Sequence, residues 1–361
     1  MNINRATREY ETWLGEHITL VPDDLTSKHT KMADALFPLL RATFYRWAQE
    51  WPRVCAALAT APAVLAVGDV HVENFGTWRD REGRLIWGIN DFDEAYLLPY
   101  TNDLVRLATS AQLAIGAGHL SVKASEASKA ILAGYMEGLQ AGGRPFVLAE
   151  HHQQLKADAT NSLSDPALFW KKLERLPTVN QAIPAGATNA LKHVLPEAGL
   201  RYHVAHRVAG LGSLGRQRWV ALAEWHGGSI AREVKALAPS AWMWANDRTT
   251  RPKRYYQAIV DQAVRAPDPY LRVGKRWLVR RLAPDCGRIE ISDLPKERDE
   301  IGLLHAMGWE TANIHSGSRD EIKAIRRDLA RRQEGWLHTA VEAMAHAVTA
   351  DWKVWRRDGA S

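Results

Sequence analysis

Hydrophobic residues recur at three- and four-residue spacing in several parts of the chain. Between residues 30 and 60 the period is carried by Met32, Leu36, Leu39, Leu40 and Phe44. This spacing is typical of an amphipathic helix, which we expect to end at Pro52. The same period returns from Asn102 to about Gln140 and from Ile301 onward. Both segments are therefore predicted to be helical.

Short apolar or alternating runs between these helices predict strands. The runs are Ala63–Val67, Leu85–Ile89, His203–Ala209, Arg218–Glu224, Ile230–Leu237 and Arg276–Leu282. Glycines separate the third, fourth and fifth of these runs, including a Gly227-Gly228 turn, so we expect these three strands to form an antiparallel sheet. A further helix is predicted at about Lys253–Arg265.

The stretch from Thr178 to Gly199 contains Pro184, Gly186 and Pro196, which is typical of a connection between structural units. We therefore divide the chain at this stretch. Residues 1–178 form the first part of a large region, 179–200 a connection, 201–285 a β region, and 286–361 helices that complete the large region.

Composition and charge narrow the class of protein. Hydrophobic residues make up 46% and charged residues 24% of the chain, as in soluble globular proteins. The net charge of +6 suits a polyanionic partner such as a nucleotide. Basic clusters at 248–254, 276–281 and 326–332 form no aromatic-interleaved stripe, so we do not favour nucleic acid as the partner.

Two further features bear on the compartment. The two cysteines, Cys55 and Cys286, lie far apart, which excludes a disulfide framework and favours a reducing cytoplasm. The longest apolar run, around Cys55–Val67, contains Pro62 and is too short to cross a membrane. We expect a cytoplasmic protein without a membrane partner, and the sequence leaves its oligomeric state open.

The loop after the strand Ala63–Val67 reads GDVHVENFG and carries the first chemical motif. Asp69 is followed five positions later by Asn74, the spacing of the catalytic loop of kinases. A carboxylate orients or deprotonates the attacking hydroxyl there, and an amide oxygen helps to hold a metal. His71 is a second catalytic candidate, although imidazole also serves to support a loop or to bind metal. Asp103 is a candidate to anchor the loop through its backbone amides.

Seventeen residues beyond Asn74, the segment NDFDEA ends the next predicted strand. Asp91 has the place of the metal-binding aspartate of kinases, and Asp93 is a further ligand. Converging acidic groups repel one another unless a cation neutralises them, and hard oxygen ligands favour Mg²⁺. We therefore predict a metal site at Asn74, Asp91 and Asp93. Taken singly, each residue also suits a structural turn, and Glu73 suits either a ligand or a solvated charge.

A glycine-rich segment, GLGSLG at 210–215, lies between two predicted strands. Glycines let the backbone approach phosphates and present amide hydrogens to them. A strand follows, as in the hairpin that covers the phosphates in kinases, whereas a dinucleotide-binding motif requires a helix. The alternative is an ordinary hairpin turn. The predicted nucleotide contacts are Gly210, Gly212, Ser213, Gly215 and, one strand later, Lys235.

The lysine of kinases is oriented by an acidic partner on the next helix. The predicted helix Lys253–Arg265 offers Asp261 alone, so this partner stays unassigned. Four arginines are secondary candidates for clamping a phosphate or an acidic substrate: Arg41, Arg46, Arg280 and Arg281.

The motifs GDxHxxNFG, DFDEA, GxGSxG and a following VK resemble those of the bacterial domain-of-unknown-function family DUF2252, and the likeness spans most of the chain. That family is grouped with aminoglycoside phosphotransferases and protein kinases. The resemblance implies an α+β, kinase-like fold of two lobes, a small antiparallel β lobe and a larger helical lobe. It also makes Asp69 the catalytic aspartate, Asn74 and Asp91 metal ligands, and Lys235 the phosphate-binding lysine.

The motifs stand in an order that departs from ordinary kinases. Asp69 comes about 140 residues before Gly210, whereas the glycine loop and lysine come first in kinases. A circular permutation explains this order, because a pocket depends on convergence in space and chain ends often lie close together.

The hypothesis from the sequence is an ATP- and Mg²⁺-dependent phosphotransferase that acts on a small-molecule hydroxyl. One alternative keeps the fold but transfers AMP, or binds nucleotide without turnover as a pseudokinase. Another is a protein that binds nucleic acid or an acidic partner through the basic clusters. A metal-dependent hydrolase using Asp69, His71 and Asp91 is favoured least.

Overall fold

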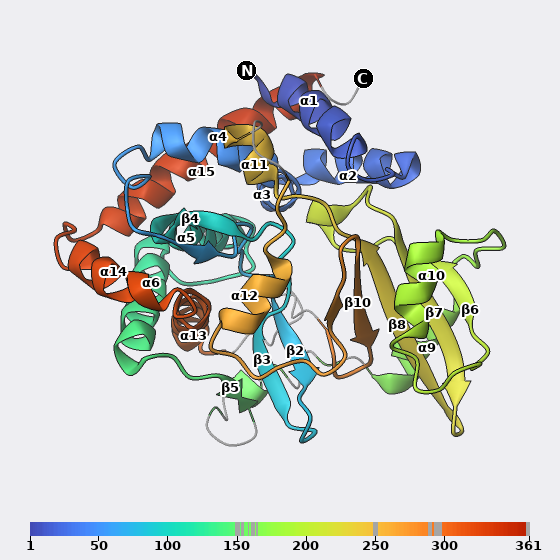
Figure 1. The fold of residues 1–361 in the computed structure, drawn as a ribbon. Coiled ribbons are helices and arrows are strands. Elements are labelled where there is room, and N and C mark those ends of the chain that lie inside the picture. Colours follow the sequence, from blue (N-terminus) through green and yellow to red (C-terminus); the bar gives the residue numbers. More distant parts are fainter. Residues whose placement is uncertain are drawn as a thin grey trace.

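Helices from both ends of the chain pack together in one part of the molecule, and the middle of the chain forms an antiparallel sheet beside them (Figure 1). The computed structural model describes residues 1–148, 152, 155–157, 159, 163, 165–247, 252–287, 291 and 298–358. The fold is mixed α and β, as predicted. No helix among these residues has both the length and the apolar character needed to cross a membrane.

The helices are α1 (Ile3–Gly15), α2 (Pro22–Asp34), α3 (Leu36–Ala42), α4 (Phe44–Val54), α5 (Tyr100–Gly116), α6 (Ala124–Ala141), α9 (Pro166–Glu174), α10 (Ala185–Lys192), α11 (Ala241–Asn246), α12 (Tyr256–Gln262), α13 (Glu300–His315), α14 (Ile322–Leu329) and α15 (Trp336–Asp358). The strands are β1 (Ala63–Ala66), β2 (Phe75–Arg79), β3 (Leu85–Ile89), β4 (Tyr96–Pro99), β5 (Phe146–Val147), β6 (His203–His206), β7 (Arg218–Trp225), β8 (Gly228–Ala236), β9 (Arg272–Val273) and β10 (Trp277–Leu282).

The helical part has its main core around α5, α6, α13 and α15. Glycines bring α6 and α13 into close contact, since a Cβ atom at Gly134 would lie 1.9 Å from the carbonyl oxygen of His305. Gly308 of α13 approaches Ile131 of α6 in the same way. The C-terminal helices thus cover the elements that carry the first two motifs.

The sheet has the strand order β6-β7-β8-β10-β9, and every neighbouring pair is antiparallel. A two-residue turn joins β7 to β8, with φ of 48° at His226 and 76° at Gly227, the left-handed backbone that such hairpins require. The turn therefore lies one residue earlier than the predicted Gly227-Gly228. Leu191 of α10 packs on one face of the sheet and Leu173 of α9 on the other.

The predicted helix over residues 30–60 is wrong in its continuity. Extended backbone at Ala35, with φ of −158°, separates α2 from α3, and Thr43 separates α3 from α4. Pro52 lies inside α4 rather than at its end. Proline lacks the N–H that would bond the carbonyl of Ala48, and the side chain of Asn246 donates to that carbonyl at 3.1 Å instead.

Other predicted boundaries also changed. The helix expected from Asn102 to Gln140 is two helices, α5 and α6. The segment expected to be a connection contains α10, whose Ala187 and Leu191 are buried against the sheet. Strand β2 follows Asn74 directly and pairs with β3, while β4 pairs with β1.

Candidate functional site

The loop that carries Asp69 is fixed by a buried carboxylate at the start of α5. Asp103 accepts hydrogen bonds from the backbone N–H groups of Val67 at 2.7 Å and Gly68 at 3.0 Å. Its side chain is fully buried and also lies 3.0 Å from Nε2 of His315 in α13. The predicted anchoring role of Asp103 is confirmed. Helix α5 therefore sets the position of Asp69.

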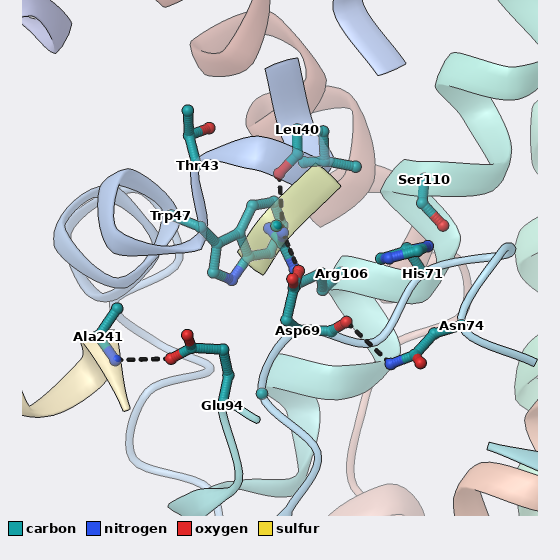
Figure 2. A network of polar contacts seen from close by, with 12 residues as sticks. Leu40, Thr43, Trp47, Asp69, His71, Asn74, Glu94, Arg106, Ser110 and Ala241 are labelled. Atoms are coloured by element: carbon teal, nitrogen blue, oxygen red, sulfur yellow. Dashed lines mark hydrogen bonds and ion pairs between the residues drawn. The ribbon is translucent and has the colours of Figure 1, made fainter. Parts of the chain in front are cut away.

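Asn74 connects the first two motifs. Its side-chain N–H₂ donates to the backbone carbonyls of Asp69 and Asp91, each at 3.2 Å; Figure 2 shows Asn74 pointing toward Asp69. Because both bonds use the nitrogen, the amide oxygen stays available as a ligand. The spacing of five residues thus corresponds to a closed loop with a defined orientation of the amide.

Arg106 holds the carboxylate of Asp69 and was not identified from the sequence. Its Nε donates to Oδ1 of Asp69 at 2.8 Å and its Nη2 contacts the same oxygen. Nη2 also donates to the carbonyl of Leu40 at 2.9 Å, as Figure 2 shows. The guanidinium stacks on Phe44 and Trp47. Burial raises the pKa of Asp69, and the positive charge of Arg106 opposes that rise.

The carboxylates of the second motif lie beside Lys235, the lysine of the fourth motif. Nζ of Lys235 lies 2.6 Å from Oδ2 of Asp93 and 3.5 Å from Oδ1 of Asp91. Lys235 is 1% exposed. The acidic side chain that Lys235 contacts in the structure therefore comes from a segment 142 residues earlier in the chain. Asp261, the candidate on α12, accepts instead from Gln257 on the same helix.

A second basic side chain joins this cluster. Arg216 lies 3.2 Å from Asp93 and 2.8 Å from Glu94, and it is 3% exposed. Glu94 also accepts from the backbone N–H of Ala241 at 2.6 Å, which Figure 2 shows. Burial raises the pKa of Glu94 to about 7, against the charge of Arg216. Arg216 was not predicted as a site residue, and its place directly after the glycines is its one sequence signal.

The glycine-rich segment lies against the loop of Asp69. A Cβ atom at Gly212 would be 3.2 Å from Oδ2 of Asp69, so a larger residue would crowd the carboxylate. Gly210 and Gly215 have φ of 74° and 91°, the left-handed region that favours glycine. Oγ of Ser213 accepts from Arg218 of β7 at 2.7 Å. These residues join β6 to β7, the predicted hairpin.

Helix α2 and Val21, the residue before it, hold the glycine segment in place. The backbone N–H of Val21 donates to the carbonyl of Gly215 at 2.8 Å. Nζ of Lys28 donates to the carbonyl of Gly212 at 3.3 Å, and Leu25 lies directly on Gly215. The segment is therefore held down over Asp69.

His71 and Glu73 lie within the loop itself. Nδ1 of His71 accepts from the backbone N–H of Glu73 at 3.2 Å, and the ring packs edge-on against Phe37. His71 is 7% exposed. These contacts match the loop-supporting reading of His71. Glu73 forms an ion pair with Arg41, so the reading of Glu73 as a solvated charge is wrong.

A cavity of about 30 Å³ lies between these elements. It is lined by Arg41, Asp69, His71, Asn74, Asp91, Asp93, Glu94, Gly210, Leu211, Gly212, Ser213 and Arg216. Of the secondary arginines, Arg41 alone lines it. Arg46 pairs with Asp351, Arg281 with Asp285 and Arg280 with Glu233. Predicted residues of the first two motifs and of the glycine segment thus line one space, whereas Gly215 and Lys235 do not line it.

The residues at this cavity fit a magnesium–phosphate complex better than a metal cage made by protein alone. The described residues contain no group of three or more His, Cys, Asp or Glu side chains arranged to hold a metal ion. Mg²⁺, however, uses one or two carboxylates together with substrate phosphates. Oδ1 of Asp93 is buried and has no hydrogen-bond partner among the described residues. With Asp91 and the amide oxygen of Asn74, it forms such a partial ligand set.

Comparison with known proteins gives one match. The model of a family described as "Uncharacterized protein conserved in bacteria (DUF2252)" matches residues 20–168 and 148–358. The matched residues include all four motifs. No curated protein and no solved structure matches the chain.

Proposed function

This chain belongs to the bacterial family DUF2252, and from that premise we propose that it is an ATP- and Mg²⁺-dependent phosphotransferase with a circularly permuted, kinase-like fold. A hydroxyl group of a small molecule is the proposed acceptor. One observation carries the proposal: Lys235 and Gly212 lie against Asp91, Asp93 and Asp69, more than 140 residues away in the chain.

The arrangement of the sheet supports the kinase-like part of the proposal. The glycine segment joins the first two strands of the sheet, β6 and β7, and the lysine stands on the third, β8. Kinases use the same order of glycine loop and lysine-bearing strand. Ile3 of α1 and Trp355 of α15 share one cluster in the helical part (Figure 1), so the two end helices lie close together, as a permuted chain requires. The proposed small lobe is this sheet with α9 and α10, and the proposed large lobe is the helical part.

The first catalytic task falls to Asp69. Its carboxylate orients the acceptor hydroxyl and takes up the proton as the phosphoryl group is transferred. Arg106 fixes the carboxylate through one of its oxygens, which leaves Oδ2, the atom beside Gly212, to face the acceptor. Because burial raises the pKa of Asp69, the carboxylate is a better proton acceptor than a solvated aspartate.

The second task is to hold the triphosphate. Asn74, Asp91 and Asp93 would hold the magnesium ion, which when bound neutralises phosphate charge and orients the phosphates. Lys235 forms ion pairs with the two aspartates in the protein alone. On nucleotide binding we expect it to exchange part of this contact for phosphate oxygens. The backbone of residues 210–215 contributes N–H donors.

For a nucleotide to bind in this way, the cavity beside Asp69 must become larger. Pockets for ligands of this size usually hold about 300–1,000 Å³, whereas the cavity holds about 30 Å³. The glycine segment lies on Asp69 and is held there by Val21 and Lys28. The proposal therefore includes a movement of the sheet and its glycine segment away from Asp69.

The test is a transfer assay that identifies the product by mass. The protein is incubated with ATP, Mg²⁺ and a panel of small hydroxyl compounds, and the proposal expects an acceptor that gains phosphate. The Asp69→Asn variant is expected to lose transfer, while Asp261→Asn, on the exposed side of α12, is expected to retain it. Gain of adenylate instead would establish AMP transfer, the alternative suggested by the unusual partners of Lys235. Transfer that is equal in Asp69→Asn would refute the assigned role of Asp69.

A further inference from the structure

The sheet face that carries Lys235 also carries a cluster of arginines around one carboxylate. Glu233, two residues before Lys235, lies opposite Val220 of β7 and Arg280 of β10 in the sheet register. Arg218 lies opposite Lys235. The side chains of alternate residues point to the same face of a sheet. The cluster and Lys235 therefore share one face.

Three guanidinium groups converge on Glu233. Nη1 of Arg218 and Nε of Arg280 donate to Oε1 at 2.8 Å and 2.9 Å. Arg207, at the end of β6, contacts Oε2. Glu233 is 1% exposed. Burial alone would raise its pKa, but the three positive charges outweigh burial and hold the pKa well below its ordinary value.

The cluster contains more positive charge than is needed to neutralise Glu233. Three arginines converge on Glu233, the carboxylate with which Arg207 and Arg280 form ion pairs. Arg218 is 3% exposed, whereas the side chains of Arg207 and Arg280 are 26% and 24% exposed. Three positive charges therefore face the one negative charge of Glu233, which leaves the cluster able to attract an anion. The two more exposed arginines, Arg207 and Arg280, border solvent.

The position of the cluster connects it to the proposed catalytic site. Nη2 of Arg218 donates to Ser213 in the glycine segment at 2.7 Å. The charges of Asp91 and Glu233 both raise the pKa of Arg280, although burial opposes them. A nucleobase is uncharged and packs best against apolar side chains. A sheet face lined by arginines suits phosphate, whose oxygens match the forked donors of arginine.

We propose that Arg207, Arg218 and Arg280 form a binding site for a phosphate or diphosphate group, next to the cavity of Asp69. Arg207 and Arg280 provide the exposed donors, and Arg218 joins the bound anion to the glycine segment through Ser213. This inference deepens the proposed phosphotransferase and rests on it for the identity of the ligand. The phosphate belongs either to the donor nucleotide or to an acceptor that is already phosphorylated.

Calorimetric titration with pyrophosphate in the absence of metal tests the site. The wild-type protein is expected to bind pyrophosphate. The single variants Arg207→Gln and Arg280→Gln are each expected to bind at least tenfold more weakly, since one charged hydrogen bond contributes about 1.5–3 kcal/mol. The matched control is Arg272→Gln, an exposed arginine on β9 of the same sheet, which is expected to bind like the wild type. Each single variant leaves Glu233 with two arginines, and thermal unfolding checks that the fold is kept.

The outcomes separate this inference from the proposed function. Equal binding by all variants, or equal loss in Arg272→Gln, would overturn the arginine site. Absence of pyrophosphate binding in a protein that binds ATP with Mg²⁺ would overturn it too, while the phosphotransferase proposal stands. Pyrophosphate binding without binding of Mg²⁺-ATP would support the anion site and contradict the phosphotransferase. Competition between ATP and pyrophosphate assigns the site to the donor, and simultaneous binding assigns it to the acceptor.

Discussion

Replacement of Lys235 by methionine tests the charge arrangement from which the proposed site is built. The buried Nζ of Lys235 lies 2.6 Å from Asp93, whose side chain is 8% exposed. Breaking a buried ion pair by removing one partner costs about 3–5 kcal/mol, because the other charge stays buried and unpaired. Asp93 keeps Arg216 at 3.2 Å in the variant. We therefore expect the unfolding free energy to fall by about 3 kcal/mol, the lower end of that range.

The assay is urea unfolding followed by circular dichroism, with and without Mg²⁺. Lys275→Met, at an exposed position, is the control and is expected to change the unfolding free energy by less than about 0.5 kcal/mol. Because Mg²⁺ replaces the missing positive charge beside Asp91 and Asp93, we expect it to restore part of the stability of Lys235→Met. A loss no larger than that of the control would refute the buried pair. A loss that Mg²⁺ leaves unchanged would contradict magnesium binding by Asp91 and Asp93 in the absence of a triphosphate.

Two further predictions concern the glycine segment and a buried acid. Gly212→Ala places a Cβ atom about 3 Å from the carbonyl of Arg41 and from Asp69, so we expect this variant to bind ATP more weakly in calorimetry. The control Gly116→Ala, whose Cβ atom would meet no atom within 4 Å, is expected to bind ATP like the wild type. Burial raises the pKa of Glu310 from 4.5 to about 7, against a hydrogen bond from Asn313 and the charge of Arg265. The folded state therefore keeps a proton that the unfolded chain loses, and this group makes stability fall as pH rises from 4.5 to about 7. Glu310→Gln is expected to flatten that fall in urea midpoints measured across this range, and an unchanged slope would contradict the raised pKa.

The sequence identified most of the strands and the residues of the four motifs. The strands β7, β8 and β10 were predicted from apolar or alternating runs bounded by glycines, and side chains pack on both faces of these strands. Asp69, Asn74 and Asp91 were found through their spacing, and the loop geometry depends on that spacing. Patterns of this kind can be recognised from the sequence, because they depend on residues that are close together in the chain.

Contacts between distant segments could not be predicted in the same way. Arg106 stands in the helical pattern of α5 as one polar residue among many, and its role depends on Asp69, 37 residues earlier. The partner of Lys235 was sought on the next helix, yet Lys235 pairs with Asp93, which lies 142 residues earlier in the chain. Pro38, in the first turn of α3, is a sequence signal for the break at Ala35. The break at Thr43 has no glycine or proline beside it, and tertiary packing of α3 and α4 determines it.

The most direct test of the central claim is calorimetric binding of ATP with and without Mg²⁺ to the wild type and to Asp91→Asn. If the distant motifs enclose one triphosphate and its cation, ATP binds tightly to the wild type when Mg²⁺ is present. Removal of either Mg²⁺ or the Asp91 charge then weakens ATP binding at least tenfold, because losing a hydrogen bond to a charged group costs about 1.5–3 kcal/mol. Equal binding with and without Mg²⁺, unaffected by Asp91→Asn, would contradict the account.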